Sequence, residues 1–228
     1  MLKPTEIPFR QTNPSLGHWS GTFKSWPSSV KPWPDWYIRV SASKQTHWKE
    51  LGIFICLALT IANTNKDESM LSAATYFWSD TFNAFLFGQG QMTPTLLDIT
   101  MLTGLDITSS ANPVSLNTKS KFSYKTRSIG GWIGYIKMNM GNGPVTLQEH
   151  VTFLMMWLEK FLFCGPSCSP TTNWQHLAEA LVDERQFPLG KYLLGAIYQT
   201  LSSATTRIAS DVVICHALKF PLSCFKIG

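Results

Sequence analysis

Charged residues are scarce in this sequence of 228 residues. They make up 14% of it, against about 25% in a typical soluble protein. With so few charges and 44% hydrophobic residues, the chain must bury much of its surface or associate with something else. Nine Trp and fourteen Phe side chains strengthen this expectation, because aromatic rings carry large apolar areas. The length suffices for one well-buried domain.

The sequence also lacks the apolar segments that direct a chain to a membrane. Its N-terminus holds Pro4, Glu6 and Pro8 where a signal peptide needs an apolar stretch, so we expect no export. The longest apolar run, residues 52–62, falls well short of the ~20 residues of a membrane-spanning helix. Five cysteines at uneven spacing indicate reduced thiols in an intracellular compartment. We therefore expect no membrane partner.

Motifs of the common enzyme classes are missing as well. There is no Gly-x-Ser-x-Gly nucleophile elbow and no Walker lysine after a glycine loop. A dinucleotide fingerprint beginning at Gly88 would need its third glycine at Thr93. No Gly/Ser-rich phosphate cradle lies beside a lysine that could carry a Schiff-base cofactor. The sequence predicts a protein that is not an enzyme and needs no cofactor.

The cysteines allow one metal hypothesis. Cys164 and Cys168 lie four residues apart, and Cys215, His216 and Cys224 could complete a four-ligand zinc site. The first pair is one residue wider than the commonest zinc knuckle, so thiols without metal are the preferred interpretation. Zinc analysis of the purified protein distinguishes the two. We predict no metal site.

Residues 69–105 give the clearest structural pattern. Apolar residues at offsets of three and four predict a helix over residues 70–78, with Asp67 or Ser69 as its cap. The aromatic run Phe82–Phe87 ends at the turn Gly88–Gly90, which predicts a buried strand in a small hairpin near residues 82–93.

Cap signals mark further helices. Thr93 and Pro94 predict the cap and first residue of one helix, and Gly104 its end. Thr146 and Glu149 have the spacing of a capping box. The helix after them, 147–163, is apolar around most of its girth, so we expect it at the centre of the domain. Other predicted helical segments are 36–40, 44–51, 52–62, 130–140, 174–185 and 189–201.

The first 35 residues differ from the rest by their six prolines, which exclude a regular helix across them. Trp19, Trp26 and Trp33 recur in this arm. We expect these rings to fill grooves on the domain; the alternative is an arm that docks on a partner.

One basic stretch suggests a ligand. No acidic residue occurs between Asp106 and Glu149. Positive charge interleaved with aromatic rings suits a phosphate backbone or a single strand, although a solvated basic loop explains the same pattern. The candidate nucleic-acid contacts are Lys119, Lys121, Lys125, Arg127 and Lys137, and the rings are Phe122, Tyr124, Trp132 and Tyr135.

Several motifs follow one another in an order that is more specific than any single motif. They are Trp48–Ile53, Phe77–Trp78, Thr81–Phe85, Gly90–Asp98, Leu102–Leu105, Glu149–Leu154, Trp157–Phe163 and Leu193–Leu201. On these motifs, most of Trp36–Leu201 resembles the plant mobile domain of maintenance-of-meristems-like proteins, sometimes labelled "aminotransferase-like".

The resemblance implies a non-enzymatic interaction module in the nucleus, connected with transposon silencing, gene expression and meristem maintenance. It implies a protein partner of the plant long-form phosphatase type. The alternative is a nucleic-acid-binding remnant of a transposable element. We expect a mainly α single helical domain at 36–201, after a Pro/Trp-rich arm at 1–35. Because residues 202–228 depart from the family pattern, we expect a divergent tail and a truncated or mis-spliced product.

Overall fold

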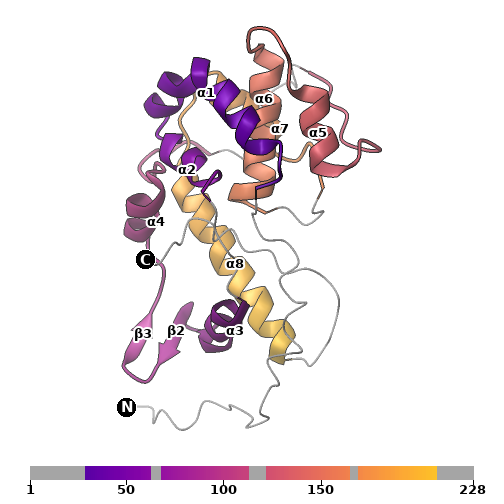
Figure 1. The fold of residues 1–228 in the computed structure, drawn as a ribbon. Helices are drawn as coiled ribbons and strands as arrows, with labels where there is room; N and C mark the ends of the chain where they lie inside the picture. Colours follow the sequence, from indigo (N-terminus) through magenta and orange to yellow (C-terminus); the bar gives the residue numbers. More distant parts are fainter. Residues whose placement is uncertain (1–28, 63–67, 113–121, 165–168, 210–228) are drawn as a thin grey trace.

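The computed structural model describes residues 29–62, 68–112, 122–164 and 169–209. It is mainly α-helical with one small antiparallel sheet, which confirms the predicted fold class (Figure 1). The helices are α1 (Trp33–Glu50), α2 (Phe54–Leu59), α3 (Glu68–Phe77), α4 (Leu96–Thr103), α5 (Gly131–Asn139), α6 (Leu147–Met156), the π-helical turn η4 (Trp157–Leu162), α7 (Gln175–Val182) and α8 (Leu189–Ala209). The strands are β1 (Trp78–Ser79), β2 (Ala84–Phe87) and β3 (Gly90–Met92).

The helix α6 and its continuation η4 occupy the centre of the core, as the sequence predicts. All α6 residues from Glu149 to Met156 are buried. Phe153 lies parallel to Trp33, with ring centroids 4.7 Å apart, and to Trp48, at 5.3 Å. Leu147, the first residue of α6, is 48% exposed, and burial begins at Glu149. The two rings on Phe153 come from α1, so α1 and α6 share one aromatic core.

Helix α1 begins at Trp33, earlier than expected. Pro32 is its N-cap, and Pro34 lies in its first turn, where a backbone N–H has no helical partner and its loss is harmless. Trp33 is fully buried, and its Nε1 donates a 2.8 Å hydrogen bond to Thr60 Oγ1. Trp19 and Trp26, the other tryptophans of the predicted arm, lie outside the described residues.

The predicted hairpin is formed by β2 and β3, and β1 adds a third strand in the order β1-β2-β3. The expectation of a buried strand is only partly met. Ala84 is buried, whereas Phe87 is 36% exposed and Phe82, in the turn before β2, is 53% exposed. Trp78 in β1 joins the sheet to α8, since its Nε1 donates to Ser202 Oγ at 3.2 Å.

The cap of α4 lies two residues later than predicted. Thr95 is the N-cap: its Oγ1 accepts from the Asp98 backbone N–H at 3.3 Å, and Asp98 Oδ2 accepts from the Thr95 backbone N–H at 2.7 Å. Thr93 instead donates to the Asn83 carbonyl oxygen at 2.7 Å. A two-way capping box satisfies two backbone donors at once, which explains why it determines the helix start. The predicted end at Gly104 is confirmed, with φ of 70°.

Two regions follow from this arrangement. We call α1, α5, α6, η4 and α7 the bundle, and α3, α4 and the three strands the hairpin region. Helix α8 joins them: it starts beside the bundle and runs along α4, α3 and β1 (Figure 1). It extends beyond the predicted end at Leu201 to Ala209. In this added part Thr205 Oγ1 donates to the carbonyl oxygen of Thr75 in α3 at 3.0 Å. No described helix is long and apolar enough to cross a bilayer.

Candidate interaction surface

An ion pair between the partly buried Arg39 and the buried Glu149 connects the first helix of the bundle to its central helix. Arg39 Nε lies 2.8 Å from Glu149 Oε1 and Arg39 Nη2 lies 3.0 Å from Oε2, a bidentate arrangement. Trp36 Nε1 donates to Oε1 at 3.1 Å. Burial alone would raise the pKa of Glu149, but the hydrogen bonds from Arg39 and Trp36 outweigh it and lower that pKa. The charge is satisfied within the fold, so the pair is structural.

This pair changes the interpretation of the predicted capping box at α6. Thr146 Oγ1 does accept from the Glu149 backbone N–H, at 3.1 Å. The Glu149 carboxylate does not complete the box, because it turns inward to Arg39 and Trp36. The hydrogen bond from the Glu149 backbone to Thr146 is therefore present as predicted. The Glu149 side chain instead binds Arg39, 110 residues away in the sequence.

The buried His150 is also used for packing. Trp48 Nε1 donates to His150 Nε2 at 3.0 Å, so Nε2 carries no proton. Burial, together with smaller contributions from the neighbouring His47 and Lys44, lowers the pKa of His150 to about 3. The ring is neutral at physiological pH and holds α1 against α6.

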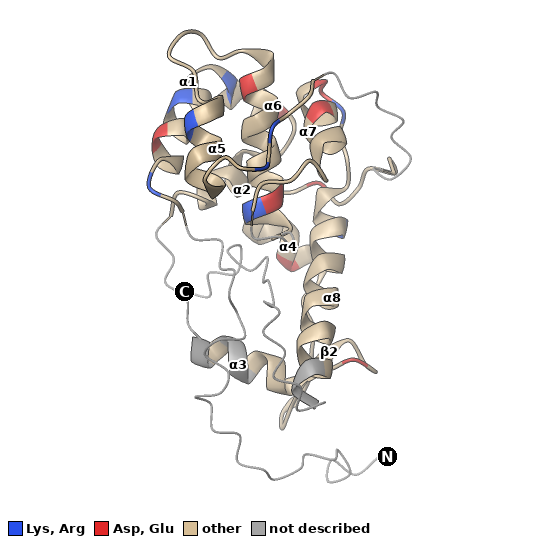
Figure 2. Ribbon diagram, turned by 90° about the vertical axis from the view of Figure 1, so that its right-hand side faces the viewer, with Lys and Arg blue, Asp and Glu red and all other residues tan. Residues whose placement is uncertain are grey.

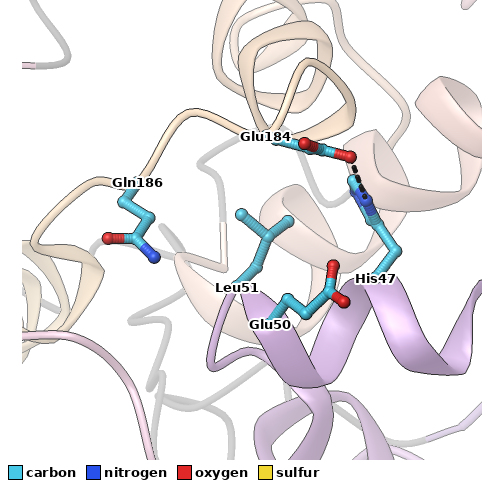
Figure 3. Close-up of a pocket in the computed structure, with 5 residues that line it drawn as sticks. All are labelled: His47, Glu50, Leu51, Glu184 and Gln186. Atoms are coloured by element: carbon cyan, nitrogen blue, oxygen red, sulfur yellow. Dashed lines mark ion pairs between the residues drawn. The ribbon is translucent and has the colours of Figure 1, made fainter.

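A small hollow of about 160 Å³ lies between the end of α1 and the turn after α7 (Figure 3). His47 Nε2 is 3.0 Å from the Leu181 carbonyl oxygen and Nδ1 is 3.8 Å from Glu184 Oε1. The volume is below the roughly 300 Å³ at which ligand pockets begin. No serine, threonine or cysteine is among its lining residues, so it offers no nucleophile. Those residues are His47, Glu50, Leu51, Glu184 and Gln186.

Within the described part of the chain, no group of three or more His, Cys, Asp or Glu side chains could hold a metal ion. Cys164 is buried, and its thiol donates to the Lys160 carbonyl oxygen at 3.4 Å. The other members of the hypothetical zinc set, Cys168, Cys215, His216 and Cys224, lie outside the described residues.

The structure places three of the five candidate nucleic-acid contacts. Lys125, Arg127 and Lys137 are exposed, whereas Lys119 and Lys121 lie outside the described residues. The aromatic side chains of the same stretch are less exposed than these basic residues. Tyr135 is 1% exposed, and its hydroxyl donates to the Thr152 carbonyl oxygen at 3.2 Å. Trp132 is partly buried and packs on the core. Tyr135 therefore cannot stack on a base in this fold, and nucleic-acid binding stays a prediction.

Large apolar side chains are exposed on the hairpin region. Leu97 is 65% exposed and Met101 is 76% exposed, and they lie one turn apart on the same side of α4. Met92 of β3 is 64% exposed. Exposed apolar groups that gather in one segment mark interaction sites more often than single ones do. We call this set the hairpin–α4 surface: Phe82, Phe87, Met92, Leu97 and Met101.

Sequence reasoning missed this surface, although α4 carried a signal. Its sequence Leu-Leu-Asp-Ile-Thr-Met-Leu-Thr has apolar residues around its whole circumference, and a single buried face can use only some of them. Ile99 and Thr103 are the buried positions. Leu96 and Leu102 are partly buried, whereas Leu97 and Met101 face solvent.

The surface is also nearly free of charge. Between residues 69 and 105 the sequence contains two charged residues, Asp80 and Asp98, and both are acidic. Hydrogen bonds from the Thr95 side chain and backbone lower the pKa of Asp98, which keeps it ionised. Figure 2 shows the basic and acidic positions gathered around α1, α6 and α7, while α8 is uncharged along most of its length. The local charge is thus −2 in a chain whose net charge is +5.

Comparison with known proteins gives one match. The family model described as plant mobile domain matches residues 52–222. This range starts after α1 and ends inside the segment 202–228 that the sequence pattern sets apart. Neither the curated proteins nor the solved structures give a match. The matched range covers most of the 228 residues, including every motif from Phe77 to Leu201, and the chain belongs to the plant mobile domain family.

Proposed function

We propose that this chain is a non-enzymatic interaction module that binds a protein partner through the hairpin–α4 surface. The observation that carries the proposal is the exposure of Met92, Leu97 and Met101, each at 64% or more, within ten residues of sequence. Burying such side chains against a partner supplies binding free energy at about 25 cal/mol per Å² of apolar area. Methionine and aromatic side chains are enriched in protein interfaces relative to the rest of the surface.

Two further observations agree with recognition as the task. The plant mobile domain is not a known enzyme family. Glu149 and His150, two of the titratable groups buried in the bundle, have partners inside the fold, Arg39 for Glu149 and Trp48 for His150. They are used for stability and do not face the hollow beside His47 as a reactive set.

The family resemblance extends the proposal to a cellular role. The module would act in the nucleus, in transposon silencing, gene expression and meristem maintenance. Its partner would be a protein of the plant long-form phosphatase type, which this chain would hold or position without taking part in phosphate chemistry.

A matched pair of double variants tests the proposal. Leu97→Ser with Met101→Ser removes two anchors of the hairpin–α4 surface. Ile38→Ser with Met138→Ser removes exposed apolar side chains of the bundle, where Ile38 is 63% and Met138 is 49% exposed. With a purified plant long-form phosphatase as the probe, titration calorimetry should show an affinity loss of at least about tenfold for the first variant. The second should stay within about twofold.

Equal affinities for the two variants would contradict the proposal that the hairpin–α4 surface binds the partner. Loss only in the bundle variant would place the interface on α1 and α5 instead. Salt-sensitive binding to single-stranded DNA or RNA that is lost in Lys125→Ala with Arg127→Ala would favour the nucleic-acid alternative.

A further inference from the structure

The strand β3 forms a free edge of the sheet. Strand β2 pairs on both sides, with β1 and with β3, whereas β3 pairs only with β2 among the described strands. All three residues of β3 are exposed. Figure 1 shows β3 on the outer side of the sheet, away from α3 and α8. An edge of this kind presents backbone N–H and C=O groups that an added strand can pair with.

This edge has one of the usual protections against pairing, its length of three residues, but lacks the others. Edge strands are also commonly guarded by lysine, proline or a bulge. Gly90, Gln91 and Met92 carry no charge, and their register with β2 runs without a bulge. The first proline, Pro94, comes after the strand ends. The short length of β3 limits what can pair with it to a short extended segment.

The side chains next to this edge form an unfinished apolar row. Trp78 pairs with Phe85, and Phe85 pairs with Met92, so the three point to the same side of the sheet. Exposure rises along the row, from 3% for Trp78 to 64% for Met92. Trp78 and Phe85 already contact each other, with ring centroids 5.0 Å apart. A fourth strand would place its own side chain beside Met92 and cover it.

Charge indicates what kind of segment fits. The only charged groups in residues 69–105 are the carboxylates of Asp80 and Asp98. A segment with Lys or Arg beside its apolar residues is attracted to this region, and an acidic one is repelled. A second copy of the chain pairing through its own β3 would bring a region with the same two carboxylates and no basic residue in 69–105, so a self-pairing is disfavoured.

We infer that the edge of β3 is a docking site for an extended segment of a partner protein, which adds to the sheet as a fourth strand. That segment carries an apolar side chain beside Met92 and Lys or Arg residues at its flanks. The inference rests on the proposed function, because it specifies how part of the hairpin–α4 surface is used. It adds backbone pairing to the apolar contacts.

The test uses the full chain and synthetic peptides as probes. One peptide alternates Val and Thr and has Lys at both ends, a second replaces each Lys with Glu, and a third repeats the first with alternate backbone amides N-methylated. In ¹⁵N NMR titrations the Lys-ended peptide should shift the amide signals of Gly90–Met92. Its affinity should exceed that of the Glu-ended peptide by at least about fivefold, and N-methylation should abolish binding because it removes the strand's donors.

Variants complete the experiment. Met92→Lys should lower affinity for the Lys-ended peptide by at least about tenfold, with the bundle signals unchanged as the control for folding. Asp98→Asn should remove most of the preference for Lys over Glu. The inference is overturned if neither peptide shifts the β3 signals, if the N-methylated peptide binds as well as its parent, or if the protein alone dimerises through β3.

The outcomes also separate this inference from the proposed function. Phosphatase binding that is lost in Leu97→Ser with Met101→Ser, combined with no effect of any peptide on β3, would leave the proposed function intact and exclude strand addition. If a peptide docks on β3 but neither double variant affects phosphatase binding, strand addition is supported and the proposed function is contradicted.

Discussion

The bundle and the hairpin region use aromatic and aliphatic side chains in opposite ways. In the bundle, Phe153 is completely buried between indole rings, and the polar groups around it are paired with one another. In the hairpin region, Phe82, Met92 and Leu97 are more than half exposed. Similar side chains thus stabilise the fold in one region and remain available to a partner in the other. Composition alone cannot distinguish these two uses.

The largest effect on stability is expected for replacing a phenylalanine by alanine, and it should differ between the two regions. Phe153→Ala should lower the free energy of unfolding by about 3–5 kcal/mol, because it leaves a cavity among Trp33, Trp36 and Trp48. Phe82→Ala, the matched control at a position 53% exposed, should change it by less than about 0.5 kcal/mol. Urea unfolding followed by tryptophan fluorescence measures both. Equal losses would mean that the hairpin region is packed as tightly as the bundle.

Acid should act on the bundle through His150. Burial holds its pKa at about 3 in the folded protein, against the usual 6.5 of a histidine side chain. Because the unfolded chain binds this proton more readily, stability is greatest above pH 6.5 and falls as the pH drops towards 3. Between pH 7 and pH 5 the loss from this group is about 2 kcal/mol.

The pH effect is checked by urea unfolding across that range. His150→Asn, which cannot titrate, should be less stable at pH 7 because the hydrogen bond from Trp48 is altered, but its stability should depend less on pH. A variant with the same slope as the parent would show that groups other than His150 cause the acid sensitivity.

A smaller loss of stability is expected when the capping box at the start of α4 is removed. Asp98→Ala removes half of the capping box with Thr95 and should lower the free energy of unfolding by about 1 kcal/mol. Asp98→Asn keeps an acceptor for the Thr95 backbone N–H and should lose less. Thermal unfolding followed by circular dichroism measures both. If Asp98→Ala leaves the free energy of unfolding unchanged, the capping box with Thr95 does not stabilise the start of α4.

The smallest effect on stability belongs to the proposed interface. Leu97→Ser with Met101→Ser should change the free energy of unfolding by less than about 0.5 kcal/mol, since both side chains are already mostly in water. Differential scanning calorimetry of the isolated protein checks this. A loss above about 2 kcal/mol would show that these side chains are part of the core, and partner binding by this variant would then say little about an interface.

Local signals in the sequence predicted much of the fold. Residues 147–163 are apolar around most of the helix circumference, which correctly predicted that α6 and η4 lie in the core. Gly104 correctly predicted the end of α4, where the backbone is left-handed. Both are properties of a few neighbouring residues. The resemblance over several ordered motifs agreed with the family, which the match over residues 52–222 then established.

Contacts between distant segments could not be predicted in the same way. Glu149 had the spacing of a capping residue, but Arg39, 110 residues away, binds its carboxylate. Thr93 and Thr95 both precede α4 and could both cap its first turn. Thr95 is the N-cap because Asp98, three residues later, completes the capping box with it. The exposure of Leu97 and Met101 depends on what packs against α4, which no local pattern contains. The hairpin–α4 surface therefore emerged only from the three-dimensional structure.

Hydrogen–deuterium exchange of the full chain, alone and with a purified plant long-form phosphatase, tests the central claim most directly. The account predicts slower exchange on binding at residues 90–101, and no change at 147–162, which are already protected in the free protein. New protection confined to 125–137 or to the hollow beside His47, with residues 90–101 unaltered, would contradict it.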